Sequence, residues 1–240
     1  MPKVAPLALA LTATTPPANA FRPFTLPGRF PPFQPRTGIV LWSTNPAAAD
    51  APVPLEYSYL AYRQVVRAKG EYDWAPVEKL LDQVAARRHQ AIIRWHDTYV
   101  GKRSGVPDYI QALPDYRGKT AKSEGKPTGF PDWSHPELRR FALEFFARFA
   151  ERYDRDPRLA FVQTGFGLWA EYHIYDGPMQ LGHTFPAMDY QAEFARHLAG
   201  ALRDTPWLIS VDAGSSRRAP FVRNPELLAL PFGLFDDSFN

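Results

Sequence analysis

The sequence predicts an α/β fold of the (β/α)8 TIM-barrel type, incomplete, with about six strand–helix units present. Short apolar runs alternate with amphipathic stretches, and this alternation is typical of a parallel sheet covered by helices. The runs are apolar at almost every position, as parallel strands buried on both faces are. Long polar loops follow the strands, which favours a barrel with its site at the carboxyl ends of the strands. A doubly wound open sheet is the alternative, because periodicity does not distinguish the two folds.

Six apolar, partly β-branched runs are interpreted as strands. A polar segment at 100–133 follows the third run and is too long for an ordinary connection, so we expect it to be functional. The predicted strands are 37–43, 56–63, 90–99, 159–167, 207–212 and 232–236.

Three stretches show the 3.6-residue spacing of an amphipathic helix. The predicted helices are 74–88, 136–153 and one that begins at Asp189. Asp73 is the expected N-cap of the first, and Pro76 lies in its first turn, where a missing N–H costs nothing. The second opens with a capping box at 134–137.

The amino-terminal part divides into two segments before the barrel domain, which we place at 37–240. Residues 1–20 carry one lysine, a short apolar stretch and an Ala-Asn-Ala cleavage pattern, so they are interpreted as a signal peptide. A disordered Ala/Pro tail is the alternative. Residues 21–36 are rich in Pro and Phe and are expected to run extended over the surface. The signal implies a periplasmic or secreted protein.

Composition excludes several classes of function. The chain has 240 residues and no cysteine, so disulfides, cysteine-based zinc sites and a cysteine nucleophile are excluded. A net charge of +3 does not indicate a nucleic-acid partner, and no stretch is long and apolar enough for a membrane span. Nucleotide-binding glycine motifs and the H-E-x-x-H spacing are absent, so we expect no cofactor and no metal. The oligomeric state is not indicated.

The fourth predicted strand ends in the most informative polar group. Glu171 and His173 are two residues apart and would project to one side of an extended chain. Trp169, two residues before Glu171, would project to the same side. A carboxyl group among aromatic rings suits a general acid, and sugars stack on aromatic walls. The alternative is that Glu171 pairs with an arginine and merely orders its loop.

The third predicted strand places Arg94 and His96 on one parity and Trp95 on the other. An arginine facing the helices would be buried without a partner at high cost, so we expect Arg94 and His96 to face the barrel interior. They would clamp the substrate, form a salt bridge to Glu171 or Asp212, or do both.

The remaining candidates lie at other strand ends. Asp212 ends the fifth predicted strand and is the possible second carboxylate, and Asp236 ends the sixth. For the neighbouring Asp237 a turn or cap role is preferred. The tryptophans expected to stack on a sugar ring are Trp42, Trp95 and Trp169.

The segment GFGLWAEYH at 165–173 resembles the Gly-x-Trp-Gly-Glu-[Trp/Tyr]-His stretch of an uncharacterised bacterial (β/α)8 family, a domain of unknown function. That family is similar to the clan of retaining glycoside hydrolases that includes β-galactosidases. The resemblance covers about 37–240 and implies that Glu171 is the acid/base residue. Ala170 departs from the Asn of the clan and the Gly of the family. The clan's nucleophile follows a seventh strand, and we count six. The supporting segments are 58–63, 71–74, 92–95 and 236–239.

We therefore expect an exported glycoside hydrolase-like barrel that acts on a polysaccharide or oligosaccharide, with Glu171 as general acid/base. Arg94, His96, His173 and Asp212 would line the sugar site. The alternative is a non-catalytic carbohydrate-binding protein on a degenerate or truncated barrel. A third possibility is a truncated chain with neither activity.

Overall fold

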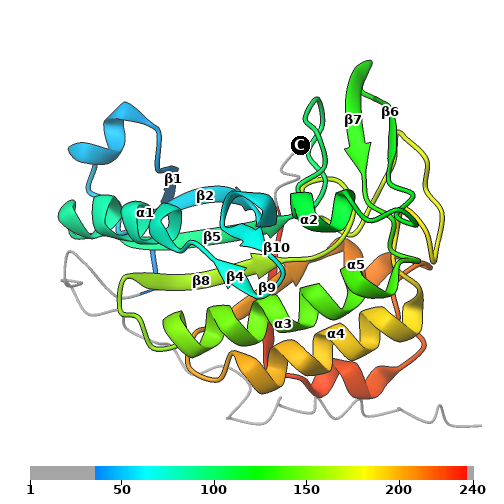
Figure 1. The fold of residues 1–240 in the computed structure, drawn as a ribbon. Helices are drawn as coiled ribbons and strands as arrows, with labels where there is room; N and C mark the ends of the chain where they lie inside the picture. Colours follow the sequence, from blue (N-terminus) through cyan, green and yellow to red (C-terminus); the bar gives the residue numbers. More distant parts are fainter. Residues whose placement is uncertain (1–35, 237–240) are drawn as a thin grey trace, which may run out of the picture. The chain divides into compact units, whose positions relative to one another are not determined.

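The computed structural model describes residues 36–236, and the six main strands within them form one parallel sheet (Figure 1). Their order in the sheet is their order along the chain. A doubly wound sheet reverses its strand order at a switch point, whereas strands that follow one another without reversal are those of a barrel wall. The fold is therefore the partial TIM-barrel type. The strands are β1 (Val40–Trp42), β2 (Leu55–Ala61), β5 (Gln90–His96), β8 (Leu159–Thr164), β9 (Trp207–Ser210) and β10 (Phe232–Phe235).

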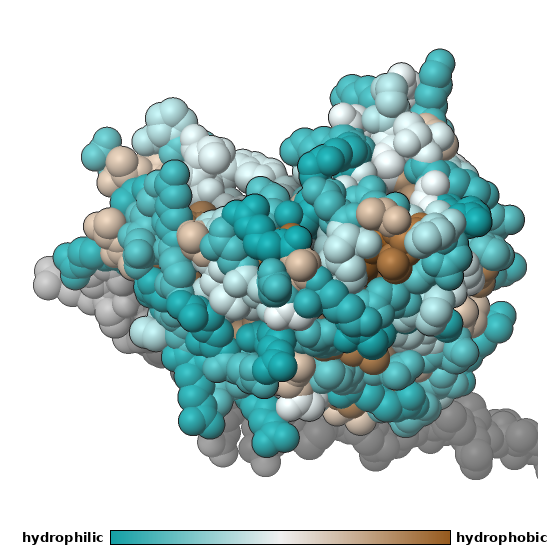
Figure 2. Space-filling view, viewed as in Figure 1, coloured by the Kyte–Doolittle hydropathy of each residue, from teal (hydrophilic) through white to brown (hydrophobic). Residues whose placement is uncertain are grey.

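Three long helices cover one face of this sheet. They are α1 (Ala75–Ala86), α3 (Pro136–Tyr153) and α4 (Met188–Ala201). The main core lies between them and the outward-facing strand residues, where Phe145 and Phe149 of α3 pack against Trp95. The opposite face has a small cluster around Leu55 and Ile92 to which strand residues alone contribute. One covered face and one inner face agree with a barrel wall. Figure 2 shows that hydrophilic residues cover most of the visible outer side.

Two antiparallel hairpins and several short helices lie in the connections. β3 (Val66–Ala68) pairs with β4 (Glu71–Tyr72), and neither was predicted. The long polar segment after β5 is not a plain loop, since it contains α2 (Asp108–Gln111) and the hairpin of β6 (Lys119–Ser123) and β7 (Lys126–Phe130). The other short helices are α5 (Asp212–Ser215) and the 3-10 turns η1 (Pro46–Ala49), η2 (Tyr62–Gln64) and η3 (Pro225–Ala229).

The helices begin at other residues than the expected caps. His135 caps α3, its Nδ1 accepting from the Glu137 N–H at 3.2 Å, so the capping box prediction was wrong. Asp73 bonds the Ala75 N–H at 3.0 Å without being the N-cap. Asp189 lies in the first turn of α4, after its N-cap. In each case the N-cap is a residue close to the predicted one. A sequence pattern does not distinguish between neighbouring candidates for the cap position.

β1 is not the buried strand that its apolar sequence predicted. It pairs only with β2 within the described part of the chain. Val40 and Trp42 are exposed, and Ile39 before them is 71% exposed. An apolar run indicates burial only when another layer covers it, and among residues 36–236 none covers this one.

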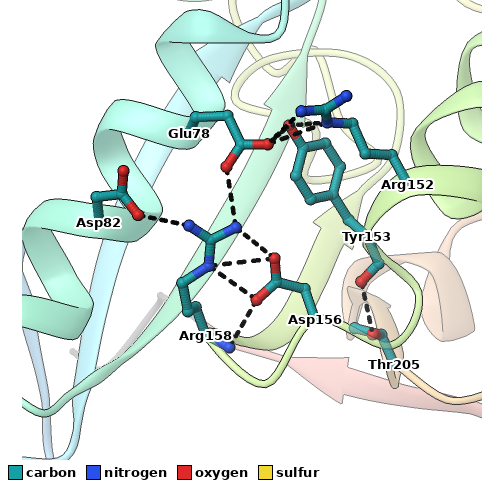
Figure 3. A network of polar contacts seen from close by, with 7 residues as sticks. All are labelled: Glu78, Asp82, Arg152, Tyr153, Asp156, Arg158 and Thr205. Atoms are coloured by element: carbon teal, nitrogen blue, oxygen red, sulfur yellow. Dashed lines mark hydrogen bonds and ion pairs between the residues drawn. The ribbon is translucent and has the colours of Figure 1, made fainter.

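A network of charged groups ties α1 to the segment that enters β8 (Figure 3). Arg158 directly precedes β8 and binds Glu78 at 2.9 Å, Asp82 at 2.5 Å and Asp156 at 2.6 Å. These bonds raise the pKa of Arg158, Asp156 contributing most. The network lies at the amino end of β8, away from the strand ends at which barrel sites occur, so its role is to hold the fold.

Residues 1–20 and almost all of 21–36 lie outside the described residues, as does Asp237. The expectations for a signal peptide, an extended segment and a turn at Asp237 therefore stay predictions. No helix among residues 36–236 is long and apolar enough to cross a membrane.

Candidate active site

Glu171 lies in a tight loop after β8 and not on an extended strand, so the expected strand geometry was wrong. The strand ends at Thr164, and the chain then turns with left-handed backbone at Trp169, Ala170 and Tyr172, where φ is 52°, 64° and 59°. Left-handed non-glycine residues cost on the order of 1–3 kcal/mol each and cluster at functional sites. Backbone hydrogen bonds within the loop hold this conformation, including Glu171 N–H to the Leu168 carbonyl at 2.9 Å.

Two glycines of the GFG motif make room for the loop. A Cβ at Gly165 would lie 2.3 Å from the Ala170 carbonyl oxygen, and one at Gly167 would lie 2.3 Å from the His173 carbonyl oxygen. Both obstacles are backbone atoms that cannot turn aside. The spacing of the motif therefore reflects how closely the loop folds back on the end of β8.

Arg94 connects Glu171 to the inner face of the sheet. Its Nη1 lies 2.6 Å from Glu171 Oε1 and 2.9 Å from the Tyr59 hydroxyl, and its Nε donates to Gln163 Oε1 at 2.8 Å. The guanidinium also lies 3.9 Å from the centre of the Phe235 ring. Arg94 is 1% exposed. The expectation that it faces inward and pairs with Glu171 is confirmed, so the charge is buried with partners on every side.

His173 lies between the two candidate carboxylates. Its Nδ1 is 2.6 Å from Asp212 Oδ2, and its Nε2 is 3.7 Å from Glu171 Oε2. An imidazole bonded at one nitrogen to a carboxylate is held in one orientation. The ring occupies the space between Glu171 and Asp212, where the bond to be cleaved would lie if the two acted as a hydrolytic pair. Asp212 is therefore placed to orient His173.

His96 is a neutral imidazole at the same end of the sheet. It is 6% exposed, and its ring lies 5.6 Å from Tyr59 and 5.4 Å from Tyr99. Burial, followed by the positive charges of Lys102 and Arg94, lowers the pKa of His96 to about 3. Its Nδ1 has no hydrogen-bond partner within residues 36–236. This nitrogen is buried and keeps unused hydrogen-bonding capacity.

Aromatic rings surround these polar groups. Trp169 lies 6.2 Å from Tyr99, and it stacks on Tyr175 at 6.3 Å. Trp42 is 50% exposed and packs on Tyr57 at 4.9 Å. Trp42 lines the inner face of the sheet and Trp169 lies in the loop that carries Glu171, and their stacking on a sugar stays a prediction.

Trp95 lies in neither place, and its stacking prediction was wrong. Its indole is fully buried on the helix side of β5 and stacks on Tyr62 at 5.8 Å. It alternates with Arg94 and His96 along the strand, so it points away from the inner face. Asp97 is on the same side as Trp95, is 1% exposed and accepts from Trp133 Nε1 at 3.1 Å.

The inner face of the sheet forms a cavity of about 680 Å³. Asp236 lines it together with Trp42 and Arg94, whereas Glu171 and His173 are not among its lining residues. The wall also contains apolar strand residues such as Phe161 and Leu208.

Sequence reasoning missed four residues of the site. Tyr57 and Tyr59 face inward from β2, and Gln163 and Phe235 contact Arg94. A glutamine within the apolar run LAFVQT was the one available signal, because a buried amide needs a polar partner. Among the described residues, no group of three or more His, Asp or Glu side chains is placed to hold a metal ion.

The chain was compared with known proteins. No family model matches it, and neither does any curated protein. The solved structures to which it is similar at low identity include three different glycosidases. Endo-glycoceramidase II from Rhodococcus sp., in complex with ganglioside GM3, is 14% identical with a TM-score of 0.47, and the match covers 68% of this chain and 42% of that one.

The other two structures have lower TM-scores. The α-galactosidase TtGalA from Thermus thermophilus, in complex with stachyose, is 16% identical with a TM-score of 0.42, over 78% of this chain and 37% of that one. The β-galactosidase from the psychrophilic Marinomonas ef1 is 13% identical with a TM-score of 0.42, over 66% and 33%. The chain thus spans less than half the length of each of these proteins.

Proposed function

We propose that this domain is part of a glycoside hydrolase in which Glu171 is the general acid/base. The observation that carries the proposal is the placement of Glu171 at the carboxyl end of β8, 13% exposed in its side chain and held by Arg94. Barrel enzymes carry their catalytic residues at such strand ends.

The surroundings of Glu171 suit a sugar. Trp169 and Trp42 offer ring faces on which the C–H face of a pyranose stacks. His96 and His173 add ring nitrogens with unused hydrogen-bonding capacity, which a sugar hydroxyl group would use once neighbouring side chains let it reach them. A few fixed polar groups among aromatic rings are typical of small-molecule sites.

The roles of the histidine and the second carboxylate follow from their bond. Asp212 holds the His173 ring, and Nε2 of that ring faces Glu171. His173 then either positions Glu171 or forms a hydrogen bond with the substrate. Asp212 acts by orienting the His173 ring.

Replacing the Glu171 carboxyl group tests the proposal. General acid/base catalysis contributes about 10²–10⁴-fold to rate, so Glu171→Gln should lower the hydrolysis of aryl glycosides by that factor. Because Arg94 is buried and loses its counter-charge, Glu171→Gln should also be less stable than the wild type, so activities are compared at a temperature at which both proteins are folded. Glu151→Gln is the matched control, since Glu151 is an exposed carboxylate on α3. Equal activity of the two variants would refute the assignment.

A second function, carbohydrate binding without turnover, is favoured by one observation. The His173 ring fills the space between Glu171 and Asp212, the two carboxylates on the loops after β8 and β9. Binding to a glycan array with no product released from any bound glycan, at any pH from 4 to 9, would support this function over hydrolysis.

We also propose that the protein is exported, on the basis of the signal-like residues 1–20. Expression in a bacterial host followed by cell fractionation tests this. Mature protein in the periplasm or medium that begins at Phe21 supports export. Protein found in the cytoplasm that still carries Met1 contradicts it.

A further inference from the structure

Four lysines lie beside the candidate active site, on the turn after β5 and on the β6–β7 hairpin. We call them the basic rim: Lys102, Lys119, Lys122 and Lys126. All four are exposed, and none forms an ion pair with any residue of the described range 36–236. The hairpin rises from the end of the sheet at which β5 finishes (Figure 1).

Backbone bonds join the two parts of the rim. Gly101 N–H donates to Thr128 Oγ1 at 2.9 Å, and Gly129 N–H donates to the Lys102 carbonyl at 2.9 Å. Lys102 is thereby fixed against β7, next to Lys126. The four positive charges belong to one structural unit and do not move independently of it.

The rim touches the candidate site at two places. The Lys102 Nζ lies 4.0 Å from the centre of the Tyr99 ring, and that ring contacts His96 and Trp169. At the hairpin tip, the Tyr175 hydroxyl donates to Glu124, and the Tyr175 ring stacks on Trp169. A ligand that lies on Trp169 therefore passes within reach of the rim.

A smaller cavity at the base of the hairpin extends the positive surface. It measures about 390 Å³, and Arg117, Lys119 and His183 line it. Asp132 also lines it, but its carboxylate already accepts from the backbone of Arg117 and Ser134. Two carboxylates lie at the hairpin tip: Glu124 accepts from the Tyr175 hydroxyl, and exposed Asp176 accepts from the Glu124 N–H.

The excess of positive charge is confined to the segment that carries the basic rim. Residues 101–130 contain six Lys or Arg and three Asp or Glu, an excess of three, and the whole chain has 28 against 25, also an excess of three. The rest of the protein is balanced, so it offers no long stripe for a nucleic acid, whose binding typically uses six to ten phosphate contacts. A polymer with carboxylates spaced along it can be bound by the few lysines of the basic rim.

We propose that the substrate bound at this site is an anionic glycan, a polymer of uronic acids, whose carboxylates lie along the basic rim while one sugar ring reaches Glu171. This inference names the substrate class of the proposed hydrolase and rests on that function. Exposed lysines attract such a chain over about 8–10 Å at moderate salt.

The test measures binding separately from turnover. Polygalacturonate and alginate are titrated into the intact protein carrying Glu171→Gln, with the wild type in parallel. The fully methyl-esterified form of polygalacturonate is the uncharged control ligand. We expect at least one acidic polymer to bind about tenfold more tightly than the ester, and 0.5 M NaCl to remove the difference.

A triple variant locates the charge that matters. Lys102→Gln with Lys122→Gln and Lys126→Gln should weaken binding of the acidic polymer about tenfold, since each exposed charge contact is worth a factor of a few. The matched control removes three exposed charges elsewhere, at Lys79, Arg148 and Arg203. It should bind like the parent protein.

Several results would overturn the inference. They are binding of neither acidic polymer, equal affinity for polymer and ester, equal loss in the two triple variants, and equally tight binding of duplex DNA. Charge-dependent binding with no product from the wild type would support the inference and refute the hydrolase. Hydrolysis of a neutral glycan with no preference for charge would refute the inference and leave the hydrolase.

Discussion

Asp97 should make the stability of this protein fall as the pH rises from 4 to 8. Its side chain is fully buried behind β5, with one oxygen bonded to Trp133 Nε1 at 3.1 Å. Desolvation raises the pKa of Asp97 to about 7, although hydrogen bonding to Thr98 and Trp133 acts in the opposite direction.

The magnitude follows from the difference between the folded and unfolded chain. An unfolded aspartate has a pKa of about 3.9, and each unit of difference is about 1.36 kcal/mol. Between pH 4 and 7 the folded protein binds the extra proton, so its stability falls as the pH rises. The full loss is on the order of 4 kcal/mol above pH 7. The total free energy of unfolding of a domain of this size is about 5–15 kcal/mol.

Urea unfolding of the wild type and Asp97→Asn at several pH values measures this loss. The asparagine resembles the protonated acid and cannot ionise, so the two proteins should be about equally stable at pH 4. At pH 8 the variant should be more stable by on the order of 4 kcal/mol, with an unchanged m-value. Exposed Asp108→Asn should follow the wild type. A wild-type and Asp97→Asn difference that varies by less than about 1 kcal/mol from pH 4 to 8 would show that the carboxyl group is not desolvated as described.

Two further substitutions test the packing. Glu56 is fully buried and accepts from Arg87 Nε at 2.6 Å and from His89 Nδ1 at 2.7 Å. Glu56→Gln removes the buried carboxylate that bonds the partly exposed Arg87 guanidinium and His89, so we expect a loss of about 1–3 kcal/mol in urea unfolding, against less than about 0.5 kcal/mol for exposed Glu151→Gln. Gly165→Ala puts a Cβ 2.3 Å from a carbonyl oxygen and should cost about 1–3 kcal/mol. Gly200→Ala, in α4 with nothing within 4 Å, should instead stabilise by up to about 1 kcal/mol. Equal effects within either pair would contradict the structural reason.

The strand and helix positions were predictable because their patterns are local. All six predicted strands exist, and the α3 face with Phe145 and Phe149 follows from spacing alone. The β6–β7 hairpin was not predicted, because KTAKS and KPTGF are too polar to show an apolar run. Its stability comes from pairing and from bonds to the turn at Gly101, which are not visible in either segment by itself.

The candidate site was predictable in its members and not in its geometry. The alternation of side chains along β5 correctly predicted that Arg94 faces inward, since side chains alternate between the two faces of any strand. The same rule failed for Glu171, because the strand stops at Thr164 and the next residues adopt left-handed backbone. Ala, Trp and Tyr are poor indicators of such a conformation, which glycine and asparagine normally mark.

The position of Arg94 explains why the site residues come from segments far apart in the sequence. Its guanidinium bonds Tyr59 of β2, Gln163 of β8 and Glu171 of the following loop. It also lies over the Phe235 ring of β10. A planar group with five donors can serve partners in several directions at once, which a lysine cannot. Because its charge is buried, these partners are required wherever Arg94 is present. The loop that carries Glu171 is therefore positioned by the inner face of the sheet as well as by its own backbone bonds.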